Sequence, residues 1–318
     1  MQMIGKTLKD KDSSSNMLQQ AVPFLGLVVV CIFFQIATKG KLLSTSNFKA
    51  FSNYAFQMVI PACGLVFLMA QGQLDFSMAG IVCVCCILGA KASYINPWLA
   101  PVVAIVVGVA LGFFNGCTHV FLGVQSFVAT IATSFMYGGL ASALLGGGAI
   151  TSDFALKKAD TLFVKYGIIA FFLVATWLLL SFTPFGKHCK AIGAKEEVAH
   201  QSGVRIRLGK MAAFLICGMS CGVMASFVLF RTCSAATSSG GTTQLNALLA
   251  LLLGGVPFSG GWSARFRCVL AGSLLMAVVT SGLTLMNVSS NSQQIIKGIL
   301  FVIAVAISFD RKNTAVIQ

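Results

Sequence analysis

Most residues that could do chemistry in this sequence lie within or beside long apolar runs. Two of them, Asp75 and Lys297, are charged, and a charge at the centre of a bilayer costs about 2.5–3.5 kcal/mol on insertion scales. We expect Lys297 to extend toward the nearer surface. The others are uncharged hydrogen-bonding residues: Asn115, Thr130, Thr133, Asn246, Asn287, Gln293 and Gln294. Each could simply join two helices, but together they favour a path for a neutral polyhydroxylated solute, because the apolar runs hold no pair of carboxylates for an ion.

The sequence carries no recognisable catalytic or metal-binding motif. Nothing resembles GxSxG, HExxH or a phosphate-binding loop, and Gly146–Gly148 lacks the Lys-Ser/Thr that such a loop requires. The 11 cysteines are scattered through apolar runs without a CxxC pair facing a histidine, so we interpret them as small hydrophobic residues. We therefore predict a protein that is not an enzyme and that has no metal site and no cofactor.

The composition identifies the environment in which these residues lie. The chain has 318 residues, of which 57% are hydrophobic and only 9% are charged, whereas soluble domains carry about 25% charged residues. This excludes a soluble enzyme and a disordered chain and indicates a protein embedded in a lipid bilayer. The net charge of +14 is then expected on cytoplasmic loops, and it does not indicate binding to nucleic acid.

The elements that must position the polar residues are apolar helices. We predict apolar segments at about 21–37, 52–70, 78–91, 98–115, 127–145, 163–182, 210–230, 243–256, 265–286 and 291–309. The segments 78–91 and 243–256 are shorter than the roughly 20 residues of a full crossing, so they are expected as short inner helices. The predicted fold is an all-α, polytopic membrane protein with about ten transmembrane helices.

The domain organisation follows from these segments. A single transmembrane domain is expected over residues 21–309, between a cytoplasmic tail at 1–20 and another at 310–318. Residues 21–37 would also suit a signal peptide, but no small-residue cleavage site follows, so we expect an uncleaved span. With both termini inside, the inner loops hold more Lys and Arg than the outer loops, to which Lys165 is assigned, as the positive-inside rule requires.

The two halves of the chain contain a short similar tripeptide. Gln73-Leu74-Asp75 precedes one short segment and Gln244-Leu245-Asn246 precedes the other. Asp75 and Asn246 are predicted to cap the N-termini of these short helices. Because the two helices would run in opposite directions, an inverted repeat is indicated, although three matching residues could also be a coincidence. In addition, Gly108, Gly112 and Gly116 form one helix face on which another backbone can approach closely.

The longest inner loop, residues 183–209, is basic and contains a predicted polar helix at 195–201 that ends at Gly203. One interpretation is a solvated connector that meets anionic lipid headgroups. The other is a helix that docks a cytoplasmic partner. The composition of the loop by itself favours the solvated connector.

Several stretches, taken in their order along the chain, resemble the motifs of one known protein family. They are Gly72–Gly80, Gly112–Gly116 with Phe127–Thr133, Phe185–Val204, Leu253–Gly255 with Gly260–Gly261, and Gln294–Gly298 with Asp310. They resemble motifs in the permease subunits of bacterial ABC importers for ribose, xylose, arabinose, galactose and the autoinducer-2 signal. The resemblance spans about residues 47–312.

The resemblance implies a function and a set of partners. It implies a permease subunit in the bacterial inner membrane that translocates a sugar or sugar-like neutral solute. Its partners would be a second permease chain (in a homo- or heterodimer), two ATPase subunits and an extracytoplasmic solute-binding protein, with no nucleic acid. The loop 183–209 would hold the helix that couples to the ATPase, through Ala191, Ile192, Gly193, Lys195, Glu196, Glu197, Ser202 and Gly203.

This chain departs from the family pattern at three places. Gln125-Ser126 stands where the family usually has a proline, Gln244-Leu245-Asn246 replaces Glu-Leu-Asp, and Val198-Ala199-His200 replaces Ala-Ala-Arg. These departures leave the solute and the docking of a binding protein open. An ion-coupled secondary transporter is the alternative, and it would need a charge relay for which Asp75 and Lys297 are the candidates. An integral membrane enzyme would need a catalytic cluster, which is not visible.

Overall fold

The protein is almost entirely helical, as predicted. The computed structural model describes residues 23–308, so both predicted tails, 1–20 and 310–318, lie outside the described residues. The helices are Pro23–Ala37, α2 (Thr45–Ala70), α3 (Met78–Ser93), α4 (Leu99–Leu122), α5 (Ser126–Leu145), α6 (Leu162–Ser181), α7 (Pro184–Ala194), α8 (Glu196–Gln201), α9 (Ile206–Thr232), α10 (Thr243–Leu253), α11 (Phe266–Leu285) and α12 (Ser290–Ser308). Two 3-10 turns, η1 (Phe154–Ala159) and η2 (Gly261–Ser263), and the short strands β1 (Ile150–Thr151) and β2 (Ser234–Ala235) complete the described chain.

Within residues 23–308, six helices are long and apolar enough to cross a bilayer: α2, α4, α5, α6, α9 and α11. Pro23–Ala37, α3 and α10 are apolar but shorter. The protein is therefore a multi-pass membrane protein. Two boundaries differ clearly from the prediction. Helix α2 begins at Thr45, earlier than the predicted residue 52. Helix α4 continues past residue 115 through a polar turn to Leu122 and is capped by Gly123, whose φ of 68° is the left-handed conformation that favours glycine.

Helices α2 and α9 form the centre of the bundle. Most of each is buried, and the rings of Phe56 on α2 and Phe227 on α9 stack with their centroids 4.1 Å apart. Helix α4 packs on α9 through the predicted glycine face. A Cβ added at Gly112 would lie 2.5 Å from the carbonyl oxygen of Phe214, and Gly108 lies against Gly218. The predicted close approach along this face is thus confirmed, since only glycine lets the two backbones come so near.

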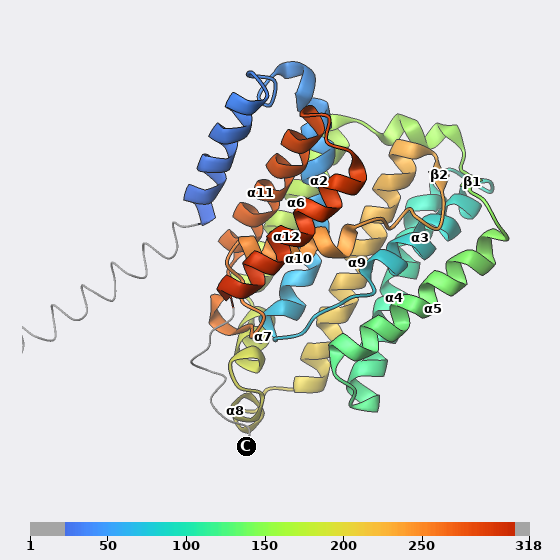
Figure 1. The fold of residues 1–318 in the computed structure, drawn as a ribbon. Helices are drawn as coiled ribbons and strands as arrows, with labels where there is room; N and C mark the ends of the chain where they lie inside the picture. Colours follow the sequence, from blue (N-terminus) through green and yellow to red (C-terminus); the bar gives the residue numbers. More distant parts are fainter. Residues whose placement is uncertain (1–22, 309–318) are drawn as a thin grey trace, which may run out of the picture.

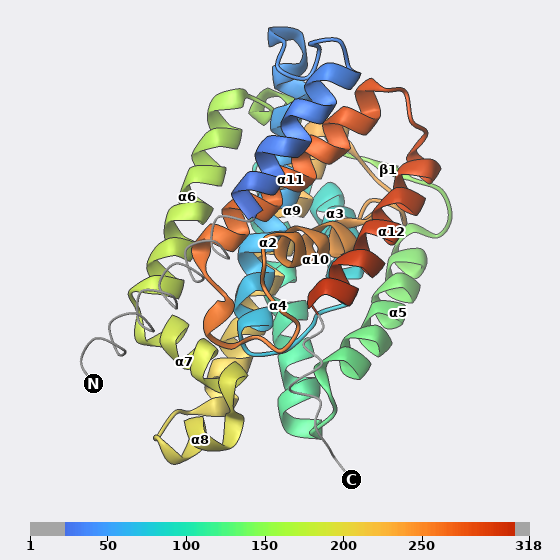
Figure 2. The same ribbon diagram turned by 60° about the vertical axis from the view of Figure 1, so that its left-hand side comes forward.

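The two ends of the bundle carry different structures. Figure 1 and Figure 2 show β1 and β2 at one end and α7 with α8 at the other. At the α7–α8 end the side chain of Gln71, just after α2, donates a hydrogen bond to the carbonyl oxygen of Gly209 in the first turn of α9. Hence α2 ends where α9 begins, and these two central helices run in opposite directions.

The short helices α3 and α10 begin inside the bundle. Each follows a segment that is not helical, residues 71–77 before α3 and residues 236–242, mostly turns, before α10. A Cβ at Gly240 would collide with the carbonyl group of Ala79 in the first turn of α3, so the segment before α10 lies directly against the start of α3. With 16 and 11 residues, these helices are about 24 and 17 Å long, shorter than the hydrocarbon core of about 30 Å.

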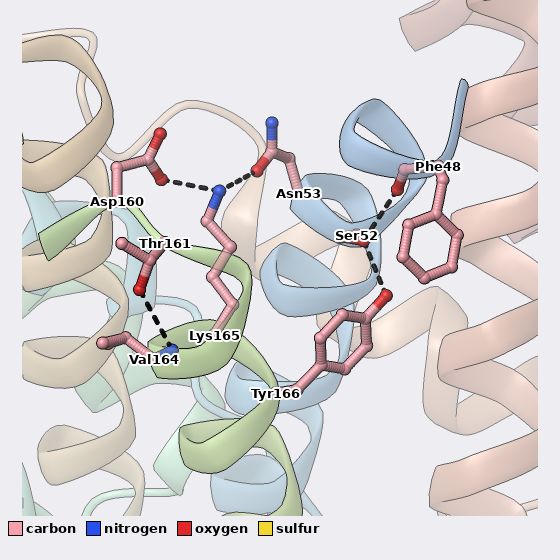
Figure 3. A network of polar contacts seen from close by, with 8 residues as sticks. All are labelled: Phe48, Ser52, Asn53, Asp160, Thr161, Val164, Lys165 and Tyr166. Atoms are coloured by element: carbon pink, nitrogen blue, oxygen red, sulfur yellow. Dashed lines mark hydrogen bonds and ion pairs between the residues drawn. The ribbon is translucent and has the colours of Figure 1, made fainter. Parts of the chain in front are cut away.

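Helix α6 is joined to α2 by a polar cluster near the β1–β2 end (Figure 3). The ammonium group of Lys165 lies 2.6 Å from a carboxylate oxygen of Asp160 and donates a 2.6 Å hydrogen bond to the side-chain oxygen of Asn53 on α2. Ser52, the residue next to Asn53 on α2, shares a 2.6 Å hydrogen bond with Tyr166 on α6 through their hydroxyl groups. The orientation argument from the sequence assigned Lys165 to an outer loop, but its side chain is buried.

Candidate functional site

A buried polar cluster surrounds the entrance of α3. The carboxylate of Asp75 accepts hydrogen bonds from the backbone N–H of Ser77 (2.8 Å) and from its hydroxyl group (2.6 Å). The same hydroxyl oxygen accepts a 2.6 Å bond from the amide of Asn115, whose oxygen accepts a 2.7 Å bond from the hydroxyl of Tyr137. The cluster therefore links the segment 71–77 to α4 and α5. All four side chains are buried.

The predicted residues of α5 lie beside this cluster. The hydroxyl oxygen of Thr130 accepts a 3.1 Å hydrogen bond from the backbone N–H of Phe76 and donates to the carbonyl of Ser126 (2.7 Å). Thr133 donates to the carbonyl of Thr130 (3.2 Å). Ser126, at one of the family departures, accepts a 3.3 Å bond from the N–H of Leu74. Because these hydroxyls bind backbone groups of the segment 71–77, they hold it in place where it has no helical partners.

The structure refines the capping role of Asp75 and corrects that of Asn246. Ser77 is the N-cap residue of α3, and Asp75 binds Ser77 and no amide of the first turn. The N-cap residue of α10 is Thr242, whereas Asn246 lies one turn inside the helix and donates to the Thr242 hydroxyl (3.1 Å). The similarity between the two tripeptides predicted Asn246 at the N-terminus of the second short helix, but α10 begins three residues earlier, at Thr243.

Asn246 belongs to a second polar cluster. Its side-chain oxygen accepts a 3.1 Å hydrogen bond from the ammonium group of Lys297 on α12. Lys297 is buried, contrary to the expectation that it extends to a surface. The two charged candidates for an ion relay, Asp75 and Lys297, thus have separate sets of partners.

Asn287 and Gln294 are placed differently from the other predicted path residues. Asn287 follows α11 with a positive φ of 57°, and Gln294 is exposed on α12. Neither joins the two buried clusters in the described part of the chain. Gln293 donates to the carbonyl of Val288 (3.0 Å). An exposed polar side chain on an apolar helix remains suited to a path shared with another chain.

Sequence reasoning missed three partners in the first cluster: Ser77, Tyr137 and Cys217. The thiol of Cys217 on α9 lies 3.6 Å from the second carboxylate oxygen of Asp75. Tyr137 carried a usable signal, since a tyrosine in an apolar helix must find a partner for its hydroxyl group. Cys217 carried none, because 142 residues separate it from Asp75.

The loop between α6 and α9 consists of α7 and α8, and the predicted helix ending at Gly203 is present as α8. Its candidate coupling residues fall into two groups. Lys195, Glu196, Glu197, Ser202 and Gly203 are exposed, whereas Ile192 is buried and Ala191 and Gly193 are half-buried. A Cβ at Gly193 would lie 2.6 Å from the backbone nitrogen of Gly261 and would collide with the carbonyl of Ala70.

Contacts join this loop to the core of the bundle. The side-chain nitrogen of Gln71 donates to the thiol of Cys189 on α7 (3.1 Å) as well as to Gly209. Burial raises the pKa of Cys189 to about 11. Lys210 on α9 binds both carboxylate oxygens of Glu196 at 2.8 and 2.9 Å. The loop therefore contacts the end of α2, immediately before the segment that leads to Asp75.

Inside the bundle the arrangement offers hydroxyl and amide groups, with one carboxylate (Asp75) in the first cluster and one ammonium group (Lys297) in the second, and at one end it offers an exposed polar helix. Among the described residues, no cluster of three or more His, Cys, Asp or Glu side chains could hold a metal ion. This geometry suits passive recognition of a polar solute and mechanical contact with a partner.

Comparison with known proteins gives the family. A family model described as "Branched-chain amino acid transport system / permease component" matches residues 47–305. The chain is 30% identical over 310 residues to the ribose import permease protein of Bacillus subtilis (strain 168), covering 94% of this chain and 95% of that protein. It is 26% identical over 265 residues to the ribose import permease protein of Escherichia coli (strain K12), covering 78% and 81%.

The xylose transport system permease protein of Escherichia coli (strain K12) is 24% identical over 361 residues, and 91% of each chain is covered. No solved structure matches the chain. The relatives are permease proteins and not enzymes, and none of them supports the alternative of an ion-coupled carrier. The match over residues 47–305, together with the identity across nearly the whole length of a relative, shows that this chain belongs to the family of permease components of the branched-chain amino acid transport type.

Proposed function

We propose that this chain is the membrane-spanning permease subunit of an ATP-driven ABC importer, which moves a sugar or sugar-like neutral solute across the bacterial inner membrane. The observation that carries the proposal is the 30% identity to a ribose import permease over 94% of the chain. The hydroxyl and amide groups of Thr130, Thr133, Asn115 and Asn246 support it, since such groups can bind a sugar without a counter-ion.

An inverted repeat of α2–α5 and α9–α12 forms part of the proposal. Helix α3 packs on α4, α5 and α9, and α10 packs on α11, α12 and α2. If α2, α3, α4 and α5 correspond in order to α9, α10, α11 and α12, the neighbours of α3 correspond one to one to those of α10. The packing of α4 on α9 likewise corresponds to the packing of α11 on α2. Together with the opposite directions of α2 and α9, this correspondence supports an inverted-topology repeat.

We propose that the first helix, α2–α6 and α9–α12 all cross or enter the bilayer, with α3 and α10 as half-helices. Their N-terminal ends lie near each other inside the bundle, which is where inverted-repeat transporters bind their solutes. The proposed path includes Asn115, Thr130, Thr133 and Asn246 from the buried clusters. Asn287 and Gln294 would face it from the surface shared with a second permease chain.

The proposed coupling runs from α8 to the entrance of α3. An ATPase subunit that binds the exposed face of α8 would move α7, which contacts the end of α2 through Gly193 and Gln71. The segment 71–77 follows directly and carries Asp75. Two ATPase subunits, one under each permease chain, would rock the bundles between outward and inward access, and an external binding protein would deliver the solute.

Replacing Glu197 with lysine should reduce solute uptake about tenfold while leaving the fold intact. Glu197 is exposed on α8 and, unlike Glu196, makes no ion pair with any residue of the described range 23–308. Reversing its charge would therefore disturb the docked partner and not the permease itself, at the scale of a typical coupling free energy. The measurement is solute uptake and ATP hydrolysis by the complete transporter in proteoliposomes.

Lys157→Glu is the matched control, because Lys157 is an exposed charge at the β1–β2 end. Uptake by this variant should stay near the wild-type rate. If the Glu197→Lys variant couples ATP hydrolysis to solute uptake as well as the wild type does, α8 is not part of the docking surface. Bulky residues at Gly193 are unsuitable for this test, because they would collide with the backbone of Ala70 and so report on folding.

The orientation of the α7–α8 end can be tested by labelling introduced cysteines in intact cells. Glu197→Cys should stay unlabelled by a membrane-impermeant maleimide until the cells are opened, and Lys157→Cys should react at once. The native Cys189 adds little signal, because its thiol is buried and its raised pKa leaves little thiolate at neutral pH. Labelling of Glu197→Cys in intact cells would show that the α7–α8 end faces the outside, contrary to the proposal.

The solute class can be tested with a panel of labelled pentoses, hexoses, nucleosides and leucine. We expect uptake of a pentose or hexose by the assembled transporter. Uptake of leucine, with no uptake of the sugars or nucleosides, would indicate that the chain transports amino acids, as the family description names.

A further inference from the structure

A basic hollow of about 410 Å³ lies where α6, α7 and the start of α11 meet. Three cationic residues line it, Lys190 from α7 and Arg265 and Arg267 from the segment that leads into α11. The tryptophans Trp177 on α6 and Trp262 on η2 flank these cations, and Ser181 and Phe266 complete the lining. None of the lining residues among 23–308 is acidic, and Arg267 already has an interaction partner, so Lys190 and Arg265 supply the positive charge that a bound anion would meet.

The cations are close enough to affect one another. Burial lowers the pKa of Lys190, and the positive charge of Arg265 lowers it further. The ammonium group of Lys190 donates one hydrogen bond, to the carbonyl of Leu180 at the end of α6 (3.0 Å). A bound anion would relieve the repulsion between Lys190 and Arg265 and would accept further hydrogen bonds from both.

The surroundings of the hollow place it at a membrane boundary. Along α6 the residues Phe171, Val174 and Leu178 are exposed, and they lead to Trp177, which contacts Phe182 edge-to-face at 5.0 Å. Trp262 is 62% exposed on the other side. Exposed apolar residues on a membrane helix suit acyl chains, and tryptophans gather where those chains meet the headgroups.

We propose that this hollow binds the phosphate group of an anionic phospholipid, with the acyl chains lying along the exposed face of α6. Basic pockets between membrane helices are known to bind such headgroups. The continuous path from the three cations to an apolar helix face favours a lipid over a free anion. This inference goes beyond the proposed transport function and requires neither the ATPase nor the solute.

The test is lipid binding by the purified, delipidated full-length chain in detergent, measured by native mass spectrometry. Phosphatidylglycerol and phosphatidylcholine with identical acyl chains are the probes. The wild-type chain should bind phosphatidylglycerol more tightly. The double variant Lys190→Ala/Arg265→Ala should bind phosphatidylglycerol about 30-fold more weakly, at about 1 kcal/mol per cation. Its affinity for phosphatidylcholine should not change.

Two variants control for folding and for charge in general. Lys187→Ala removes an exposed cation from the same helix but outside the hollow and should leave phosphatidylglycerol binding within about threefold. Arg265→Lys keeps the charge and should retain most of the binding. The proposal is overturned if the double variant binds phosphatidylglycerol like the wild type, or if the wild type does not distinguish the two lipids.

Competition experiments identify other occupants. Inorganic phosphate that displaces phosphatidylglycerol at equal concentration would make this a site for a free anion. Hexaglutamate that does so would make it a docking site for an acidic protein segment. Either result overturns the lipid assignment, and neither depends on whether the chain transports a sugar.

Discussion

Replacing Lys165 with methionine should lower the free energy of unfolding by about 3 kcal/mol. Methionine keeps most of the volume of the side chain but leaves Asp160 and Asn53 without the ammonium group that joins them (Figure 3). Lys165 also lies over the ring of Phe227, 5.3 Å from its centroid. Breaking one partner of a buried pair costs about 3–5 kcal/mol, and the partial exposure of Asp160 favours the lower end of that range.

The free energy can be measured by reversible unfolding in mixed detergent micelles, followed by tryptophan fluorescence. Lys157→Met is the matched control, because it removes an exposed lysine from the adjoining 3-10 turn and should change stability by less than about 0.5 kcal/mol. The double variant Lys165→Met/Asp160→Asn should recover much of the loss, because it no longer leaves a charge unpaired. A single variant as stable as the wild type would show that the pair contributes no net stability.

Replacing Gly112 with leucine should destabilise the protein by at least about 3 kcal/mol or prevent its assembly in the membrane. A Cβ at this position would lie 2.5 Å from the carbonyl oxygen of Phe214 and 3.0 Å from the Cα of Gly218. Both are backbone atoms, so no side-chain rotation can relieve the overlap and α4 must move away from α9. Gly108, one turn earlier, makes the same close approach to the backbone of Gly218, whereas Gly116 faces the side chain of Met211, so separation would open the interface from Gly108 to Gly112.

Gly139 on α5 offers a matched control, because a Cβ there would meet no atom within 4 Å. Gly139→Leu should leave the thermal midpoint in detergent nearly unchanged or raise it slightly, since leucine favours a helix more than glycine does. Gly112→Ala should show a smaller loss than Gly112→Leu. Equal midpoints for the two leucine variants would contradict the packing seen between α4 and α9.

Two contacts of α2, one with the Lys165 cluster and one with α7, determine how a movement of α7 would act on the bundle. The Lys165 cluster joins α6 to α2 at the β1–β2 end, whereas α7, which follows α6 directly, contacts α2 at the opposite end through Gly193. Helix α6 is thus held at both ends to the same central helix. A displacement of α7 by a docked partner would therefore act on α2 and on the segment 71–77 that follows it.

The apolar runs predicted the helices well, because the requirement to satisfy backbone groups in lipid leaves little alternative to helix. The glycine spacing on α4 predicted a close contact correctly, since periodicity determines which residues share a face. Sequence reasoning was weaker for polar residues. Lys165 was assigned to an outer loop and Lys297 was expected to reach a surface, yet both are buried with partners 112 and 51 residues away.

Hydrophobicity and local motifs depend on residues that are consecutive in the chain, so they were enough to predict a polytopic helical membrane protein, the approximate positions of its helices and its family. Which polar groups contact one another became clear from the folded structure. It brought Asp75, Asn115 and Tyr137 into one cluster, placed Asn246 against Lys297, and set Gly193 against the end of α2. Such meetings depend on the rotation and depth of each helix, which are fixed by packing against neighbours distant in the chain.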